Sequence, residues 1–321
     1  MSLDLELHLE EVAGPSDIGF PEGPVAMNDG SLLFVDIEKE TLSKVTSDGT
    51  IRTVAEIPGG PNGVAIGPDS AAYVCNNGGV YTFKEVPVPG GTANVPWPSR
   101  PNYTGGSIQR VDLSNGNVTT LYPSPWSKEK LLAPDDIVFD KEGGFWFTDS
   151  GYQDEDVQYK GALYYGTIDG QPLKKVATIP MANGVGLSPD GKTVYVSDTI
   201  FSRLWALDIK GPGEVEPGPL PDMPGRIVQS LPVHQSIYQW LDSLKVEASG
   251  KVCVGTIFNG GITVFEPNDG TFEHVPIPAL FVTNFCFGGT DMQDLWITAS
   301  SSRKIYKARW PRKGLNLAFT A

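Results

Sequence analysis

The sequence predicts an all-β fold, a six-bladed β-propeller that occupies residues 1–321 as a single domain. Three observations support this: a strand–turn–strand template that recurs six times, a basic period near 40 residues, and the lack of any long stretch with helical periodicity. The clearest copy is residues 181–198. There, a short apolar strand opened by Asn183 leads through Pro189-Asp190-Gly191 into a second strand that ends on Asp198.

Each copy of the template opens with a polar residue that carries a side-chain oxygen. The six starts are Glu22, Asn62, Asp135, Asn183, Asp242 and Asn284, separated by 40, 73, 48, 59 and 42 residues. Insertions into a basic repeat produce this uneven spacing. Because each blade packs against its neighbours, the repeat also lets 321 residues form one domain.

Composition narrows the functional classes. The chain is 40% hydrophobic with 37 Gly and 27 Pro, which suits short strands and tight turns. The net charge of −14 argues against nucleic acid or an anionic membrane surface as a partner. The sequence does not indicate the oligomeric state.

The N-terminal residues and the cysteines favour a cytoplasmic location. Residues 1–10 lack the basic start and apolar run of a signal peptide, and no apolar stretch approaches membrane-spanning length. Cys75, Cys253 and Cys286 fall inside predicted strands and are odd in number, so we expect buried free thiols in a reducing compartment.

Three segments lie outside the repeat. We expect residues 3–12 to close the ring by pairing with the last blade, whose outer strand is residues 303–310. Two insertions, 85–106 and 212–238, are rich in Pro and aromatic residues, and we interpret both as lids.

The common hydrolytic motifs are missing. The sequence has no Gly-x-Ser-x-Gly elbow, no His-Glu-x-x-His and no Cys-x-x-Cys pair. Ser150 reads as a turn residue. Of the three histidines, His8 and His274 fall in peripheral strands, and His234 lies in the second insertion, from which it could face a site.

The positive signal is the set of six repeat starts. The innermost strand of each blade lines the channel of a propeller, so these positions converge on one axis. A ring of oxygen donors that includes three carboxylates is a plausible cation site, because the carboxylates repel unless a divalent ion offsets them. The alternative is that these side chains cap their own turns, which stays open for Asn62 and Asn284. Capping fits Glu22 poorly, because Glu is a weak turn-former.

These residues also carry a family resemblance. Glu22-Gly23-Pro24-Val25, Asn183-Gly184-Val185 and Asp242-Ser243-Leu244, in that order, resemble the senescence-marker-protein/gluconolactonase (regucalcin-like) family of six-bladed propellers, and bacterial gluconolactonase-type members most of all. The resemblance runs from about residue 22 to 310. It implies one divalent cation held by Glu22, Asn183 and Asp242.

The third repeat departs from that family. Bacterial members show Ser-Pro-Asn-Asp where this chain has Ala133-Pro134-Asp135-Asp136, so Asp135 becomes a candidate fourth ligand. Vertebrate members carry an Arg at the place of Ala133 that binds the sugar lactone. We therefore expect a substrate less polar than an aldonolactone. All-oxygen ligation favours Ca²⁺, with Mg²⁺, Mn²⁺, Zn²⁺ and Fe²⁺ as alternatives.

The resemblance implies a metal-dependent lactonase, a carboxylic-ester hydrolase. The cation would polarise the lactone carbonyl, and Asp242 or Asp135 would take a proton from the attacking water. Substrate contacts are expected from Asn62, Asp136, Tyr152, His234 and Trp240. The alternatives are a phosphotriesterase or arylesterase on the same metal site, and a non-catalytic calcium-binding propeller.

Overall fold

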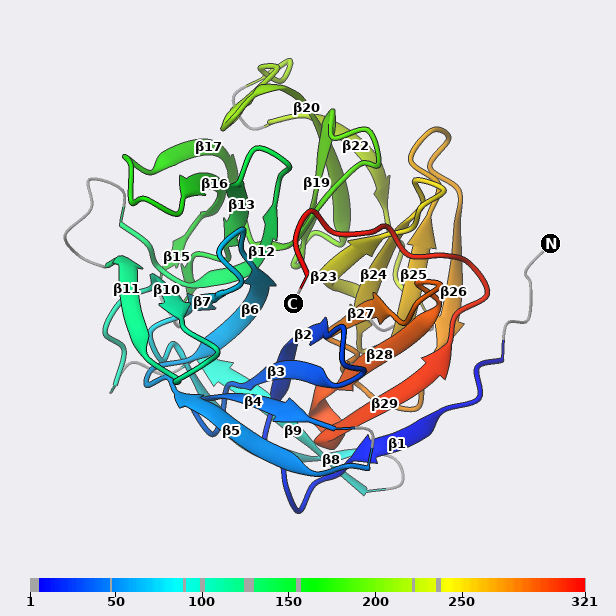
Figure 1. Ribbon diagram of the computed structural model, residues 1–321. Helices are drawn as coiled ribbons and strands as arrows, with labels where there is room; N and C mark the ends of the chain where they lie inside the picture. Colours follow the sequence, from blue (N-terminus) through cyan, green and yellow to red (C-terminus); the bar gives the residue numbers. More distant parts are fainter. Residues whose placement is uncertain are drawn as a thin grey trace.

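Six β-sheets surround a central channel, which confirms the predicted six-bladed propeller (Figure 1). The computed structural model describes residues 6–46, 48–88, 91–98, 102–123, 130–153, 157–220, 223–234 and 238–320. All pairings within the blades are antiparallel. The innermost strand of each blade begins at, or one or two residues before, one of the six polar repeat starts.

The first three blades run from the channel outward as follows. The first consists of β2 (Pro21–Ala26), β3 (Leu32–Asp36), β4 (Thr41–Val45) and β5 (Ile51–Glu56). The second consists of β6 (Pro61–Ile66), β7 (Ala72–Asn76), β10 (Ser107–Val111) and β11 (Val118–Tyr122). The third consists of β12 (Pro134–Phe139), β13 (Gly144–Asp149), β16 (Gly161–Thr167) and β17 (Lys174–Ile179), with a small hairpin, β14 (Tyr152–Gln153) and β15 (Gln158–Tyr159), inserted after β13.

The remaining blades follow the same order. The fourth consists of β18 (Ala182–Leu187), β19 (Thr193–Asp198), β20 (Arg203–Gly211) and β22 (Arg226–Ser230), with β21 (Glu214–Val215) also paired to β20. The fifth consists of β23 (Trp240–Val246), β24 (Val252–Ile257), β25 (Gly261–Phe265) and β26 (Phe272–Pro276). The sixth consists of β27 (Asn284–Gly288), β28 (Asp294–Ala299) and β29 (Lys304–Arg309), with the short 3₁₀ turn η1 (Ser300–Ser302) before its last strand.

An N-terminal strand completes the sixth blade, as expected. β1 (Glu10–Ala13) pairs with β29, with Glu10 opposite Lys307 and Ala13 opposite Ile305. The strand is shorter than the predicted 3–12, because Leu7 and Leu9 pack against the apolar core of the last two blades instead. Residues 1–5 lie outside the described part of the chain.

The first insertion is a β-hairpin rather than a loop. β8 (Tyr81–Val88) pairs with β9 (Gly91–Pro98) along its whole length. Prolines at the edge of a two-stranded ribbon cost no ladder hydrogen bond, which explains how a Pro-rich segment forms strands. The hairpin crosses from the second blade to the sixth, where Glu85 pairs with Arg303 at 3.4 Å.

The second insertion differs from the expected lid. Its residues 226–230 form β22, the outer strand of the fourth blade, with Arg203 opposite Ser230. The described residues 212–220 and 223–225 precede β22 at the other end of the propeller from the repeat starts. Residues 231–234, after β22, lie toward the face where the inner strands begin.

Apolar contacts between neighbouring blades hold the ring together. One cluster joins Val25 and Leu33 of the first blade to Val64 and Val74 of the second, and Trp146, Trp205 and Trp310 are fully buried at other blade contacts. The three cysteines are free and buried, as expected. No helix among the described residues is long and apolar enough to cross a membrane.

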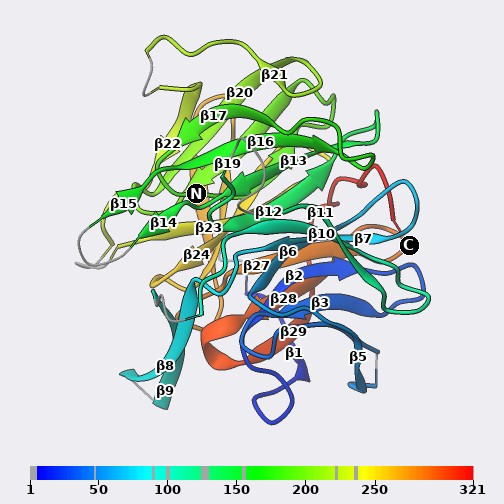
Figure 2. The same ribbon diagram turned by 90° about the vertical axis from the view of Figure 1, so that its left-hand side faces the viewer.

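The two ends of the channel carry different segments. Seen from the side, the β8–β9 and β14–β15 hairpins lie at one end and the C-terminus lies at the other (Figure 2). We call the first end the hub face, because the inner strands begin there, and the second end the tail face.

Candidate active site

A break in strand register marks the polar start of five inner strands. The pairing of β2 with β3 shifts between Glu22 and Val25, and β6, β12, β18 and β23 shift at the equivalent place. A bulge of this kind turns a side chain out of the regular alternation. It therefore aims the opening residues of these strands at the channel mouth.

Hydroxyl groups on the second strands hold the bulges in place. Ser197 accepts from the Gly184 backbone at 2.7 Å and donates to the Asp242 carbonyl oxygen at 2.6 Å. Thr148 likewise accepts from the Asp136 backbone at 3.0 Å and donates to the Asn183 carbonyl oxygen. Each hydroxyl ties its own blade to the next one around the ring.

Glycines after the polar starts allow the blades to meet closely. A Cβ atom on Gly23, whose φ is +50°, would lie 2.4 Å from the Asn62 carbonyl oxygen. A Cβ atom on Gly63 would lie 2.3 Å from the Asp135 carbonyl oxygen. No side chain fits at either place. Adjacent repeat starts are therefore next to one another in space.

The ring closes between the sixth blade and the first. Asn284 Nδ2 donates to Glu22 Oε2 at 2.9 Å, and Ser300 donates to the Pro21 carbonyl oxygen at 2.6 Å. We call Glu22, Asn62, Asp135, Asn183, Asp242 and Asn284 together the hub ring.

Several hub-ring side chains also cap their own backbone. Glu22 Oε2 accepts from Gly23 N at 2.8 Å, Asp242 Oδ1 from Ser243 N at 2.9 Å, and Asn284 Oδ1 from Phe285 N at 2.9 Å. The expectation that Glu22 does not cap is therefore wrong. The same side chains thus point into the ring and cap their own backbone, because one oxygen of each accepts a hydrogen bond from the next backbone N–H and fixes the side chain.

The carboxyl groups of the ring are buried and repel one another. Burial raises the pKa of Glu22, Asp135 and Asp242. The charge of Glu22 raises the pKa of both aspartates further, and that of Asp135 raises the pKa of Asp242. Buried acids in mutual repulsion favour protonation or a nearby cation.

Asn183 supplies an oxygen that lacks a partner. A hydrogen bond from the Asn183 amide stabilises charged Asp242 and lowers its pKa. Asn183 Oδ1 is buried and accepts no hydrogen bond from the described residues. A buried acceptor without a donor is costly, so this atom fits a cation ligand. The described residues hold no group of three His, Cys, Asp or Glu side chains arranged for a metal.

Asp136 lies beneath the ring rather than in it. Its Oδ1 accepts from Ile137 N at 3.0 Å, and its Oδ2 accepts from Val185 N at 3.4 Å and from Lys245 Nζ at 3.2 Å. With 1% of its surface exposed, Asp136 has little room for a substrate contact. Its position instead links the third, fourth and fifth blades.

The other predicted substrate contacts differ in their distance from the ring. Asn62 lies in the ring. Tyr152 is buried beside Tyr103, with ring centroids 5.2 Å apart. Trp240 opens β23 and meets Phe258 edge-on at 5.1 Å. Both aromatic residues lie on the hub face.

His234 is not brought to the ring. It is exposed and lies near His274 of β26, the outermost strand of the fifth blade. Burial lowers the pKa of His274, and the charge of His234 lowers it further. His234 follows the outer strand β22, and its expected contact with a substrate stays a prediction.

Two groups near the acids were missed from the sequence. Burial raises the pKa of the Tyr81 hydroxyl, as do the charges of Asp135 and Asp242, and a hydrogen bond with Ser150 lowers it. Ser150 also hydrogen-bonds with Asp135. The available signal was the turn Asn76-Asn77-Gly78-Gly79, which returns the chain to the hub face just before Tyr81.

Fold and ring together define a class, a six-bladed β-propeller with acids and amides gathered at one mouth of its channel. The chain belongs to the SMP-30/Gluconolactonase/LRE-like family, whose model matches residues 20–301. The resemblance found in the sequence is thereby confirmed.

Known relatives agree with this assignment. A gluconolactonase of Zymomonas mobilis is 25% identical over 93% of this chain and 80% of its own length. The lactonase drp35 of Staphylococcus saprophyticus is 30% identical over 54% of this chain, and this chain spans about half of its length, 50%.

Solved structures share the fold. A gluconolactonase from Xanthomonas campestris superimposes with a TM-score of 0.71 at 21% identity, over 95% of this chain and 90% of its own. A calcium-binding protein, regucalcin, from Agrobacterium tumefaciens superimposes with a TM-score of 0.67 at 16% identity, over 94% of this chain and 95% of its own.

Proposed function

We propose that the protein hydrolyses a lactone at the hub ring with the help of one divalent cation. Glu22, Asn183 and Asp242 would hold the cation, with Asp135 as a fourth candidate ligand and Ca²⁺ as the first candidate ion. The observation that carries the proposal is the unpartnered Asn183 Oδ1 beside repelling buried acids. When bound, the cation polarises the lactone carbonyl and stabilises the negative charge that develops on its oxygen.

The chain's own residues supply the proton transfer. Asp242 takes a proton from the attacking water, because its carboxyl group lies in the ring beside the position proposed for the cation. Asp135 is the competing base. Ser243 N and the Asn183 amide hold the Asp242 carboxylate in position.

The surroundings favour a substrate less polar than a sugar lactone. Ala133, at the position of the family's sugar-binding Arg, is buried against Val80 and Tyr152, with Tyr81 and Tyr103 packed alongside. Aromatic faces bind flat apolar groups well. We therefore favour lactones with an alkyl or aryl substituent.

The test is hydrolysis by metal-free protein of a panel of compounds, with Ca²⁺, Mg²⁺, Mn²⁺, Zn²⁺ and Fe²⁺ returned one at a time. The panel contains gluconolactone, alkyl and aryl lactones, an aryl ester and a phosphotriester. Hydrolysis is measured as the release of acid at constant pH. We expect turnover of alkyl or aryl lactones that depends on the added metal. Faster turnover of the phosphotriester or aryl ester would overturn the substrate assignment. A lack of turnover on the whole panel would favour a calcium-binding propeller.

A further inference from the structure

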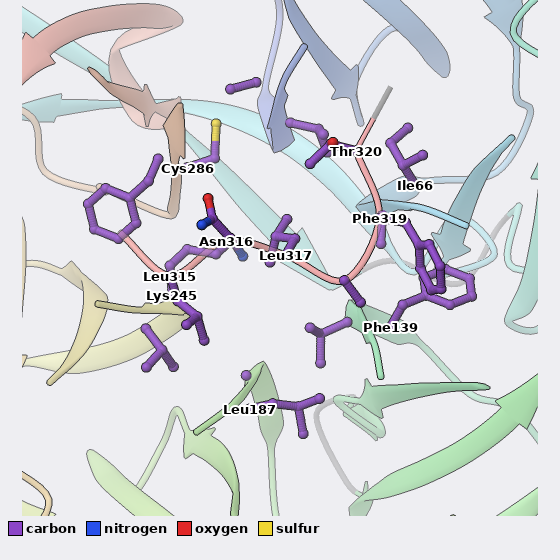
Figure 3. A pocket seen from close by; sticks show the side chains of 18 of the residues that line it. Ile66, Phe139, Leu187, Lys245, Cys286, Leu315, Asn316, Leu317, Phe319 and Thr320 are labelled. Carbon is purple, nitrogen blue, oxygen red and sulfur yellow. The ribbon is translucent and has the colours of Figure 1, made fainter. Parts of the chain in front are cut away.

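The tail face contains a cavity that the hub ring does not use. Its volume is about 610 Å³, within the range of small-molecule sites. None of the six hub-ring residues lines it. Its walls come from the far ends of the inner strands, including Ile66, Phe139, Leu187 and Cys286 (Figure 3). We call this cavity the tail chamber.

The tail chamber is apolar at its deep end. Four lysines line it, of which Lys141 and Lys210 are exposed, Lys307 pairs with Asp294 at 3.2 Å, and Lys245 reaches the buried Asp136. Val25, Val64, Ile137 and Val185 lie at its deep end, where the same strands lead up to the hub ring. Water gains few hydrogen bonds against such a surface, so an apolar molecule is the better occupant.

Lys245 provides the polar contact. Its side chain is 19% exposed, lines the tail chamber and donates from Nζ to the buried Asp136 at 3.2 Å. An ammonium group has three donors, and Asp136 already balances its charge. An uncharged acceptor such as a carbonyl oxygen therefore suits this position better than a second anion.

The C-terminal residues 315–320, here called the tail strap, cross the mouth of the tail chamber (Figure 3). The segment before the strap is firmly held. Glu247, with 0% of its surface exposed, accepts from Arg312 Nε at 2.8 and 2.9 Å and from Trp310 Nε1 at 2.8 Å.

The strap itself is held at its two ends. Leu315 N donates to the Val246 carbonyl oxygen at 2.9 Å. After Leu315, no backbone hydrogen bond joins residues 316–320 to another described residue. Phe319 packs edge-on against Phe139, with ring centroids 5.8 Å apart. Opening after Leu315 would separate Phe319 from the apolar cluster of the second and third blades but break no hydrogen bond within a blade, which gives a ligand a route in.

We propose that the tail chamber is a second binding site, for an uncharged apolar small molecule with one carbonyl-type acceptor directed at Lys245. The tail strap covers the bound molecule. This site lies at the opposite end of the channel from the proposed lactone hydrolysis and does not depend on it.

The test is a fluorescence titration with prodan, an uncharged naphthalene with a single ketone whose emission moves to shorter wavelength out of water. We expect saturable binding of one prodan per chain to the full-length protein. Leu187→Trp, which fills the chamber, should weaken binding at least tenfold. Phe272→Trp places the same new side chain on the 42% exposed surface of β26 and should leave binding unchanged.

Lys245→Met tests the polar contact separately. It should weaken prodan binding about fivefold and move the bound emission further to the blue, because the ketone loses its hydrogen bond. Absence of saturable binding, or equal binding by Leu187→Trp and Phe272→Trp, would overturn the site. An unchanged titration with Lys245→Met would overturn the proposed acceptor contact. Since no step measures hydrolysis, the result is independent of the lactonase proposal.

Discussion

The hub face and the tail face are built by the same six inner strands yet present opposite chemistry. At the hub face the strands begin with Glu22, Asn62, Asp135, Asn183, Asp242 and Asn284, all buried or partly buried. At the tail face the same strands end in apolar residues around a chamber of about 610 Å³. Between the two ends lies the ion pair of Lys245 and Asp136.

This difference arises from strand register. The bulges at the hub face turn short polar side chains into the channel, and hydroxyls of the second strands support them. Beyond the bulges regular alternation resumes, so the next channel positions are apolar. One propeller thus offers a site for ionic chemistry at one mouth and a site for an apolar ligand at the other.

The largest effect is expected from Asp242→Asn, which removes the proposed base and one negative charge facing the proposed cation but keeps the shape of the side chain. We expect kcat/KM for the best lactone to fall at least about 10³-fold. Prodan binding at the tail face should not change. Asp208→Asn, an exposed acid on β20, serves as the control and should keep full activity. Activity of Asp242→Asn within tenfold of the parent would contradict the assigned role.

The next largest effect is expected on stability, from the Lys245–Asp136 ion pair between the two ends of the channel. Lys245→Met leaves the buried Asp136 without its cation, which should lower the free energy of unfolding by about 3 kcal/mol in a urea titration. The double variant Lys245→Met/Asp136→Asn carries no unpaired charge and should recover part of that loss. Equal stability of Lys245→Met and the parent would show that the pair is not a structural link.

Cation binding should stabilise the hub face and leave the tail face unaffected. At a Ca²⁺ concentration 100 times the dissociation constant, we expect about 2.7 kcal/mol of added stability over chelated protein, seen as a rise in Tm. Asn183→Leu removes the unpartnered Oδ1 and should lose most of this rise. If Ca²⁺ and each of the other four metals left Tm unchanged, a cation at the hub ring would be ruled out.

The features that repeat along the chain were predictable from the sequence. Six polar starts at recurring intervals gave the number of blades and brought Glu22 and Asn183 to one ring, although 161 residues separate them. The alternating N-terminal segment likewise gave the closing strand β1. These features rest on local patterns, which a single sequence displays.

The features that rest on single long-range contacts were not predictable. The pairing of Lys245 with Asp136 joins positions 109 apart with no repeat to mark them. Five prolines within 85–106 hid the β8–β9 hairpin, because edge strands tolerate a residue that central strands reject. The tail chamber depends on where Phe319 packs, and no pattern in residues 315–320 reveals that.

Tyr81 was also not predictable, because only long-range contacts bring it to the acids. Its substitution has the smallest of the expected effects. Burial and the charges of Asp135 and Asp242 raise the pKa of the Tyr81 hydroxyl, so the phenol keeps its proton and can donate it to the carbonyl of a bound lactone. Tyr81→Phe keeps the packing against Val80 and Tyr152. We expect a loss of about tenfold in kcat/KM, or about 1.4 kcal/mol, with an unchanged Tm and unchanged prodan binding.

The matched control is Tyr159→Phe. Tyr159 lies on β15, has 54% of its surface exposed, and its ring centroid lies 6.3 Å from that of Tyr152. The substitution therefore removes a phenol hydroxyl on the same face but away from the acids. Its activity should stay within twofold of the parent. Equal effects of the two substitutions would mean that the Tyr81 hydroxyl contributes only to the general polarity of the hub face. A loss confined to Tyr81→Phe would instead restrict the chemistry to the acids of the hub ring and the one phenol beside them.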